Sequence, residues 1–234
     1  MFFAYSEKET SYLKAKDAAL AKLIEVVGLI QRPVIPDLFM ALVHAILGQQ
    51  ISTKAHATVW RRAQTMFAPI TPANMAGLPV STLQTCGISM RKAVYIHDVA
   101  DRICAGELDL DELQHLNDET VCQQLCQIRG IGVWTAEMLM TFSMQRMDIL
   151  SWGDLAIQRG LRMLYRHKAI TPALFTKYKK RYSPYATVAS LYLWALAGGA
   201  YEGYADPAPQ KKSSDKSKAQ GVVTKEGKYD FRSF

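Results

Sequence analysis

Helical periodicity runs through almost the whole of this sequence and constrains its fold more than any other feature. Apolar residues recur every three or four positions near 81–85, 89–105, 117–127, 133–144, 155–166, 172–181 and 185–197. Earlier helical segments are predicted over 11–28, after a capping box formed by Ser6 and Glu9, and over 37–50 and 53–67. No convincing run of alternating strand residues is present. The pattern predicts an all-α protein of about ten helices.

The composition changes near the C-terminus of the chain. Residues 205–234 are rich in Lys, Ser, Gly and Pro and contain few large apolar side chains before their end. We therefore expect a helical domain over residues 1–204 and a flexible, basic tail over residues 205–234. Hydrophobic residues make up 49% of the chain, which is enough for a packed interior.

No apolar run is long enough to span a membrane, and the N-terminus lacks the features of an export signal. The four cysteines, Cys86, Cys104, Cys122 and Cys126, have neither disulfide-framework nor metal-site spacing. We expect them to be reduced, mostly buried thiols. The chain is therefore expected to be cytoplasmic, with no membrane partner.

Positive charge is unevenly distributed along the chain, whose formal net charge is +7. No acidic residue occurs between Asp154 and Glu202, an interval with eight lysines and arginines, whereas eight acidic residues and one arginine lie from Asp98 to Glu119. A basic stretch of this kind favours nucleic acid as the partner, because phosphate neutralisation supplies most sequence-independent affinity. A solvated basic face without a ligand explains the charge equally well.

The segment LCQIRGIGVWTAEMLM, residues 125–140, predicts two helices joined by a tight turn at Gly130 and Gly132. Glycines allow a sharp turn and a close approach of the backbone to another molecule. The second helix begins at once, and its unpaired N–H groups suit a phosphate. An ordinary turn at a helix end is the alternative interpretation of this segment alone.

The segment SWGDLAIQRG, residues 151–160, places a lone carboxylate, Asp154, at the start of a helix that carries Arg159, Arg162 and Arg166. An aspartate there is a good structural N-cap. The same position can also hold a carboxylate for chemistry that requires negative charge, because a helix N-terminus stabilises an anion. Residue type alone favours the cap.

Together these two segments resemble the helix-hairpin-helix and Gly/Pro-Asp signature of the DNA glycosylase superfamily (HhH-GPD). The segments LFMALVHAILGQQISTKAHATVWRRA, GISMRKAVYIHDVA and SPYATVASLYLWALAGG resemble its DNA-3-methyladenine glycosylase II branch. The resemblance implies an all-α, two-lobed fold with the hairpin near 117–144, the active site between the lobes and no N-terminal β domain. It also implies base flipping and excision of alkylated purines from double-stranded DNA. We accordingly expect a monomer that is associated with the nucleoid in a bacterium, or nuclear in a eukaryote.

The resemblance assigns candidate roles to individual residues. Asp154 matches the catalytic aspartate, and Gly153 replaces the second acidic residue that often precedes it. The base pocket would contain Trp134, Trp194, Met138 and Leu155, with Trp60 and Trp152 as core or pocket wall. Contacts to DNA would come from Gln49, Gln50, Arg129, Gly130, Gly132 and Thr135, with Gln50 at the position of the side chain that fills the gap left by the flipped base. For Gln49 and Gln50, the alternative is that they merely end a helix.

Two further implications concern chemistry that we do not expect. Trp134 occupies the place of the lysine that forms a Schiff base in relatives with lyase activity, so only base excision is expected. No cysteine follows Cys126, so an iron–sulfur cluster is not expected, and no side chain is expected to bind a metal. A structural Na⁺ or K⁺ on the carbonyls of Cys126, Ile128 and Ile131 is implied by analogy alone. The competing hypotheses are a non-catalytic DNA-binding module, in which Asp154 is only a cap, and an oxidised-base glycosylase/lyase.

Overall fold

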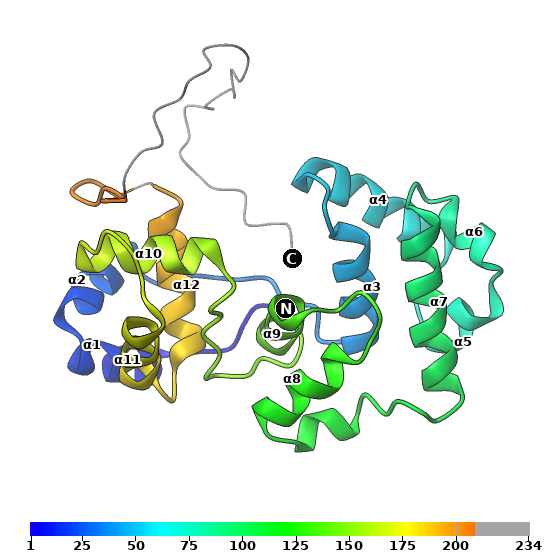
Figure 1. The fold of residues 1–234 in the computed structure, drawn as a ribbon, viewed down its shortest axis with the longest axis horizontal. Helices are drawn as coiled ribbons and strands as arrows, with labels where there is room; N and C mark the ends of the chain where they lie inside the picture. Colours follow the sequence, from blue (N-terminus) through cyan, green and yellow to red (C-terminus); the bar gives the residue numbers. More distant parts are fainter. Residues whose placement is uncertain (200, 209–234) are drawn as a thin grey trace, which may run out of the picture. The chain divides into compact units, whose positions relative to one another are not determined.

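The computed structural model describes residues 1–199 and 201–208. These residues form twelve α-helices and one short 3₁₀ helix, η1 (Figure 1). In chain order the helices are α1 (Glu7–Lys16), α2 (Ala18–Val27), α3 (Leu38–Gly48), α4 (Thr53–Met66), α5 (Pro72–Gly77), α6 (Val80–Gln84), α7 (Met90–Cys104), η1 (Glu112–His115), α8 (Asp118–Cys126), α9 (Val133–Phe142), α10 (Leu155–Tyr165), α11 (Pro172–Tyr182) and α12 (Ala186–Ala197). The prediction of an all-α fold is confirmed for this part of the chain.

Two local predictions were wrong. The single helix expected over 11–28 is interrupted at Asp17, whose carboxylate accepts hydrogen bonds from the amides of Ala19 and Leu20 and thereby begins a new helix, α2. The loops expected around residues 68–81 contain a short helix, α5, which Thr71 caps and which has Pro72 in its first turn. Both differences arise from capping side chains that start a helix where periodicity alone gives no boundary.

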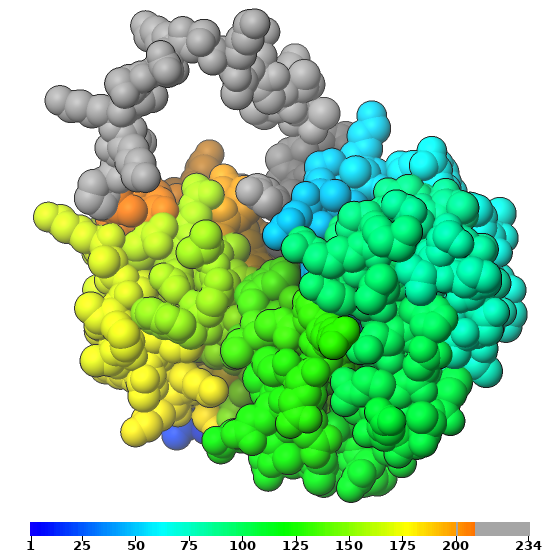
Figure 2. Space-filling view, turned by 45° about the vertical axis from the view of Figure 1, so that its right-hand side comes forward, coloured from blue at the N-terminus to red at the C-terminus, as the bar shows by residue number. Residues whose placement is uncertain are grey.

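The described residues divide into two compact units, which fits the expectation of two lobes. Unit 1 consists of Met1–Ala4 and Arg32–Arg146, and unit 2 of Tyr5–Gln31 and the described residues from Met147 onward. In unit 1, α3 is buried along nearly its whole length and packs against α4, α7 and α9. Helices α5 and α6 cover α7, and the cyan-to-green residues of this unit form one continuous surface (Figure 2).

Unit 2 is organised around α12, which is apolar and buried over most of its length. It packs against α1, α2, α10 and α11. The contact with α10 is close: a Cβ added at Gly160 would lie 2.5 Å from the backbone oxygen of Leu193. Glycine at this position therefore lets α10, the helix that begins after Asp154, lie directly against the core helix of unit 2.

In the described part of the chain, no helix has both the length and the apolar character needed to cross a lipid bilayer. The proposed tail begins at residue 205. Of the residues assigned to it, 205–208 are described, and residues 209–234 lie outside the described part of the chain.

Candidate DNA interface and candidate catalytic carboxylate

The hairpin between α8 and α9 closes on a short turn. The amide of Ile131 donates to the carbonyl of Ile128 at 3.0 Å, and Gly130 has a left-handed backbone with φ of +85°. A Cβ at Gly130 would lie 2.5 Å from a ring carbon of Tyr95, so this position requires glycine for both conformation and space. Arg129, predicted to bind DNA, is exposed on the same turn.

Helix α9 starts at the exposed Gly132, which supplies no side-chain cap. The first amides of an α-helix have no partners within the helix, and they carry the positive end of its dipole. An exposed helix start of this kind can accept a phosphate oxygen. Helices α8 and α9, with the turn between them, lie within the hairpin predicted near 117–144.

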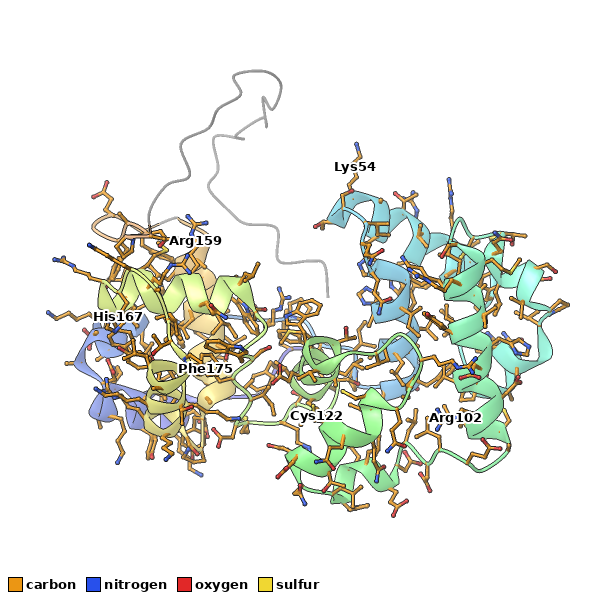
Figure 3. All side chains as sticks on the ribbon, in the orientation of Figure 1. Lys54, Arg102, Cys122, Arg159, His167 and Phe175 are labelled. Atoms are coloured by element: carbon orange, nitrogen blue, oxygen red, sulfur yellow. The ribbon has the colours of Figure 1, made fainter. Side chains whose placement is uncertain are left out.

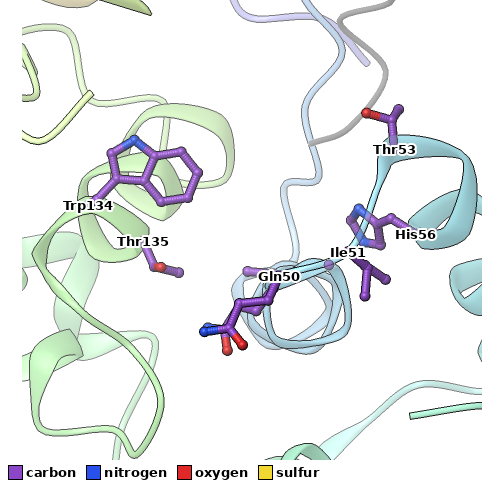
Figure 4. Close-up of a pocket in the computed structure, with 9 residues that line it drawn as sticks. Gln50, Ile51, Thr53, His56, Trp134 and Thr135 are labelled. Atoms are coloured by element: carbon purple, nitrogen blue, oxygen red, sulfur yellow. The ribbon is translucent and has the colours of Figure 1, made fainter. Parts of the chain in front are cut away.

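The chain emerging from α3 runs beside the hairpin and shares a pocket with α9. The pocket has a volume of about 240 Å³, and its wall includes Gly48, Gln49, Gln50, His56, Trp134 and Thr135 (Figure 4). Gln50 is exposed, whereas Gln49 donates its side-chain amide to the carbonyl of Gly130 at 2.7 Å. The structure thus brings three of the predicted DNA contacts, Gln49, Gln50 and Thr135, to one place in unit 1, together with Trp134 of the predicted base pocket.

The predicted pocket residues on α9 differ in exposure. Trp134 is 39% exposed and lines the pocket, and Thr135 is 8% exposed and also lines it. Met138 is only 2% exposed and does not line this pocket. An aromatic ring that is well exposed at a pocket wall can stack on a planar ligand.

Sequence reasoning missed a pair of histidines, one of which, His56, lines this pocket. The rings of His44 and His56 lie 4.2 Å apart between centroids, and Trp60 packs edge-on against His44 at 4.9 Å. The Nε2 atom of His56 donates to the carbonyl of His44 at 3.0 Å, because a carbonyl can only accept. Burial, reinforced by His56, lowers the pKa of His44 to about 3. In the sequence the two histidines flank LGQQIS, and this spacing was the available signal.

Asp154 is both buried and fixed. Asp154 is only 6% exposed. Its Oδ1 accepts hydrogen bonds from the amides of Ala156 at 2.9 Å and Ile157 at 2.8 Å. The cap expected from the sequence therefore exists. Capping does not exclude chemistry, because the same two hydrogen bonds hold the carboxylate in one orientation.

Two apolar side chains flank Asp154 in unit 2. Trp152 is 42% exposed, so it is not a core residue. Its ring packs edge-on against that of Phe175 on α11, with centroids 5.1 Å apart; Phe175 is labelled in Figure 3. Leu155 is 78% exposed. Trp194 lies on α12 and is partly exposed. Trp152 and Leu155 thus expose apolar surface on both sides of Asp154 along the chain.

A model of the HhH-GPD superfamily of base excision DNA repair proteins matches residues 43–184, which include the hairpin and Asp154. The chain belongs to this superfamily. DNA-3-methyladenine glycosylase 1 of Schizosaccharomyces pombe is 31% identical over 158 residues, which cover 65% of this chain and 69% of the relative.

Solved structures agree with this membership. A DNA-3-methyladenine glycosidase from Bacillus halodurans is 37% identical with a TM-score of 0.75, covering 85% of this chain and 93% of that one. The Schizosaccharomyces pombe 3-methyladenine DNA glycosylase, solved in complex with abasic DNA, is 29% identical with a TM-score of 0.69, covering 81% and 96%.

The basic stretch of this HhH-GPD protein is partly neutralised within unit 2. Asp206 accepts two hydrogen bonds from Arg162, at 2.9 and 2.6 Å, and lies 3.5 Å from Arg159. The hydrogen bond from Arg162 lowers the pKa of Asp206 below its ordinary value. Arg181 is likewise paired with Asp17. Asp206 and Asp17 both lie outside the interval between Asp154 and Glu202, so the sequence of that interval gave no sign that its arginines are paired. The exposed basic residues of this stretch are Arg166, Lys168, Lys177, Lys179 and Lys180.

The cysteines form no disulfide among the described residues. The expectation that they are mostly buried was wrong, because only Cys86 is buried. Cys122 and Cys126 are partly exposed on α8, and Cys104 is exposed at the end of α7.

Proposed function

We propose that this protein is a monofunctional DNA glycosylase that hydrolyses the N-glycosidic bond of alkylated purines, such as 3-methyladenine and 7-methylguanine, in double-stranded DNA. The product would be an abasic site, the starting point of base excision repair. The observation that carries the proposal is Asp154, a buried carboxylate fixed at the start of α10 in a chain of the HhH-GPD superfamily. The names of the similar proteins, 3-methyladenine glycosylases and glycosidases, support the substrate class.

The chemistry requires a negative charge that does not move. As the base leaves, positive charge develops on the deoxyribose, and a carboxylate nearby stabilises this oxocarbenium-like state. Two amides hold Oδ1 of Asp154, so little reorganisation is needed during the reaction. Gly153 precedes it, so no second carboxylate is available at that position, and Asp154 acts without one.

The other residues take part in binding and flipping. The amides at the start of α9, after Gly132, bind a DNA phosphate. Gln50 enters the space that the flipped nucleotide leaves in the stack. Trp134 and Trp194 stack on electron-poor alkylated bases, which aromatic faces attract. Trp134 has no amine with which to form a Schiff base, so the protein has no lyase activity.

An alkali cation is compatible with the hairpin. The carbonyl of Ile128 accepts one hydrogen bond, from Ile131, and a carbonyl has two acceptor lone pairs. The carbonyls of Cys126, Ile128 and Ile131 would hold Na⁺ or K⁺, which would add positive charge near a bound phosphate. All the proposed residues lie on one chain, so we further propose that the protein acts as a monomer, in the nucleoid or the nucleus where its DNA substrate is held.

The test is release of free bases from duplex DNA that carries methylated purines, for the wild type and for Asp154→Asn. Asparagine caps a helix as well as aspartate does, so the substitution removes the charge and keeps the cap. We expect the wild type to release 3-methyladenine and the variant to be slower by at least about a hundredfold. Binding to DNA, measured by fluorescence anisotropy, should be retained in the variant.

Three results would decide among the alternatives. A wild type that binds DNA and releases no base would identify a DNA-binding module. Equal turnover by the wild type and Asp154→Asn would leave Asp154 as a cap alone. A covalent protein–DNA adduct trapped by borohydride would reveal a Schiff base and hence a glycosylase/lyase.

A further inference from the structure

The segment that follows α3 is attached to the rest of unit 1 on two sides. On one side, the side-chain amide of Gln49 donates to the carbonyl of Gly130 in the hairpin at 2.7 Å. On the other, Nζ of Lys92, on α7, donates to the backbone carbonyls of Leu47 at 2.9 Å and Gln49 at 2.6 Å. Both attachments therefore meet at Gln49, the residue immediately before Gln50.

Gln50 has an unusual backbone conformation. Its φ is +58°, in the left-handed region that residues other than glycine rarely occupy. Such a conformation persists only where the surroundings hold it in place. The hydrogen bonds at Gln49 supply this restraint, because they fix the peptide that leads into Gln50.

Lys92 acts on the protein and not on a phosphate. The last carbonyls of a helix have no partners within the helix and carry the negative end of its dipole, which a lysine at that end neutralises. Lys92 is only partly exposed, and two of the three N–H bonds of its ammonium group are used on these carbonyls. Burial, together with the neighbouring Arg91, lowers the pKa of Lys92.

His56, on α4, contacts the end of α3 from a third direction. His56 lies so near to Gly48 that a Cβ there would be 2.5 Å from its ring. The same ring is hydrogen-bonded to the carbonyl of His44 within α3. The last turn of α3 is consequently held by α4, α7 and the hairpin, each through a named side chain.

We propose that Gln49 and Lys92 are positioning residues that hold Gln50 ready for insertion and join its segment to the hairpin as one rigid body. This inference rests on the proposed function, because it assumes that Gln50 fills the gap left by a flipped nucleotide. It gives Gln49 a role inside the protein instead of a contact with DNA. A wedge that is already ordered loses less conformational entropy when it enters the duplex.

The test compares two duplexes that contain the same alkylated purine, one with the lesion opposite thymine and one with it opposite an abasic site. The second duplex has no partner base to separate, so a wedge contributes less to the reaction. Gln49→Met and Lys92→Met remove the donors while keeping similar side-chain length. We expect both variants to lose about tenfold or more in kcat/KM on the paired lesion and less than about threefold on the unpaired one.

Two controls separate positioning from charge and from folding. Arg91→Met removes a neighbouring exposed positive charge, and it should lower activity on both duplexes by the same small factor, about twofold or less. Lys92→Arg keeps a donor and a charge, and it should restore most of the difference between the duplexes. Should Lys92→Met fail to fold, Gln49→Met carries the comparison, since its hydrogen bond is exposed.

The inference is overturned if Gln49→Met and wild type have the same ratio of activities on the two duplexes, whether activity is unchanged or falls equally on both. A wild type that releases no base from either duplex would instead contradict the proposed function.

Discussion

Gly130 and Gly132 of the hairpin differ in backbone conformation and in the space available for a side chain. Gly130 combines a left-handed φ of +85° with a contact to Tyr95 that leaves no room for a Cβ. Gly132 has a φ of −96°, and a Cβ built on it meets no atom within 4 Å. The fold thus requires glycine at the first position and not at the second. At Gly132 no contact within the described residues requires glycine, and the DNA phosphate that we propose at the start of α9 would supply the reason.

Alanine substitutions at the two positions should separate these reasons. Gly132→Ala should change the free energy of unfolding by no more than about 1 kcal/mol, the cost of a poorer N-cap residue, and should weaken DNA binding about tenfold. Gly130→Ala should cost more than about 2 kcal/mol of stability, through strain and overlap. Urea unfolding and fluorescence anisotropy with duplex DNA measure the two effects. Wild-type affinity in Gly132→Ala would contradict the close approach of a phosphate.

At the scale of elements, the packing of α3 against α4 depends on uncharged histidines. His44 and His56 are both buried, and burial lowers the pKa of each. Their rings pack together and against Trp60, where a positive charge would have little solvent around it. The helix pair that presents Gln50 is therefore sensitive to acid.

Stability should fall as the pH is lowered from 7 to 5. The unfolded chain binds a proton at His44 near its ordinary pKa of 6.5, whereas the folded chain binds one only near 3, so acid favours unfolding in this range. For His44 alone the loss between pH 7 and 5 is about 2 kcal/mol. Urea unfolding at the two pH values checks this, and His44→Leu should show a correspondingly smaller change. An identical pH dependence in wild type and variant would show that the pKa of His44 is the same in the folded and the unfolded chain, and would contradict the lowered value.

At the scale of the whole molecule, the eight lysines and arginines between Asp154 and Glu202 overstate the positive charge that this interval presents. Asp206 neutralises part of α10 by pairing with Arg162 and Arg159, and Asp17 pairs with Arg181. Arg159 lies on α10, the helix that begins after Asp154 (Figure 3). Removing Asp206 should therefore expose positive charge on the helix of the proposed catalytic residue.

Asp206→Ala should bind DNA more tightly, by about two- to fivefold at low salt, with a steeper dependence of affinity on salt concentration. The control, Glu112→Ala, removes one exposed negative charge from unit 1. Among the described residues, Glu112 forms no ion pair. The control substitution should change affinity less. Titrations at several salt concentrations measure both slopes. Equal effects of the two substitutions would show that only the net charge of the protein matters.

The sequence by itself determined the helical class, the hairpin near 117–144 and the cap at Asp154. Each of these depends on residues a few positions apart, and periodicity and capping are local properties. The split at Asp17 was also local, yet it was missed because an unbroken apolar pattern continues on both sides of the cap.

Only the tertiary structure decided which polar groups meet. Gln49 and Gly130 are 81 residues apart, Arg162 and Asp206 are 44 apart, and Asp17 and Arg181 are 164 apart. No helical period relates such positions, because their contact depends on how the helices pack. Local hydrogen bonding therefore specified where the hairpin and the carboxylate lie along the chain, and packing specified how the Gln50 segment is held and how much of the basic charge is neutralised.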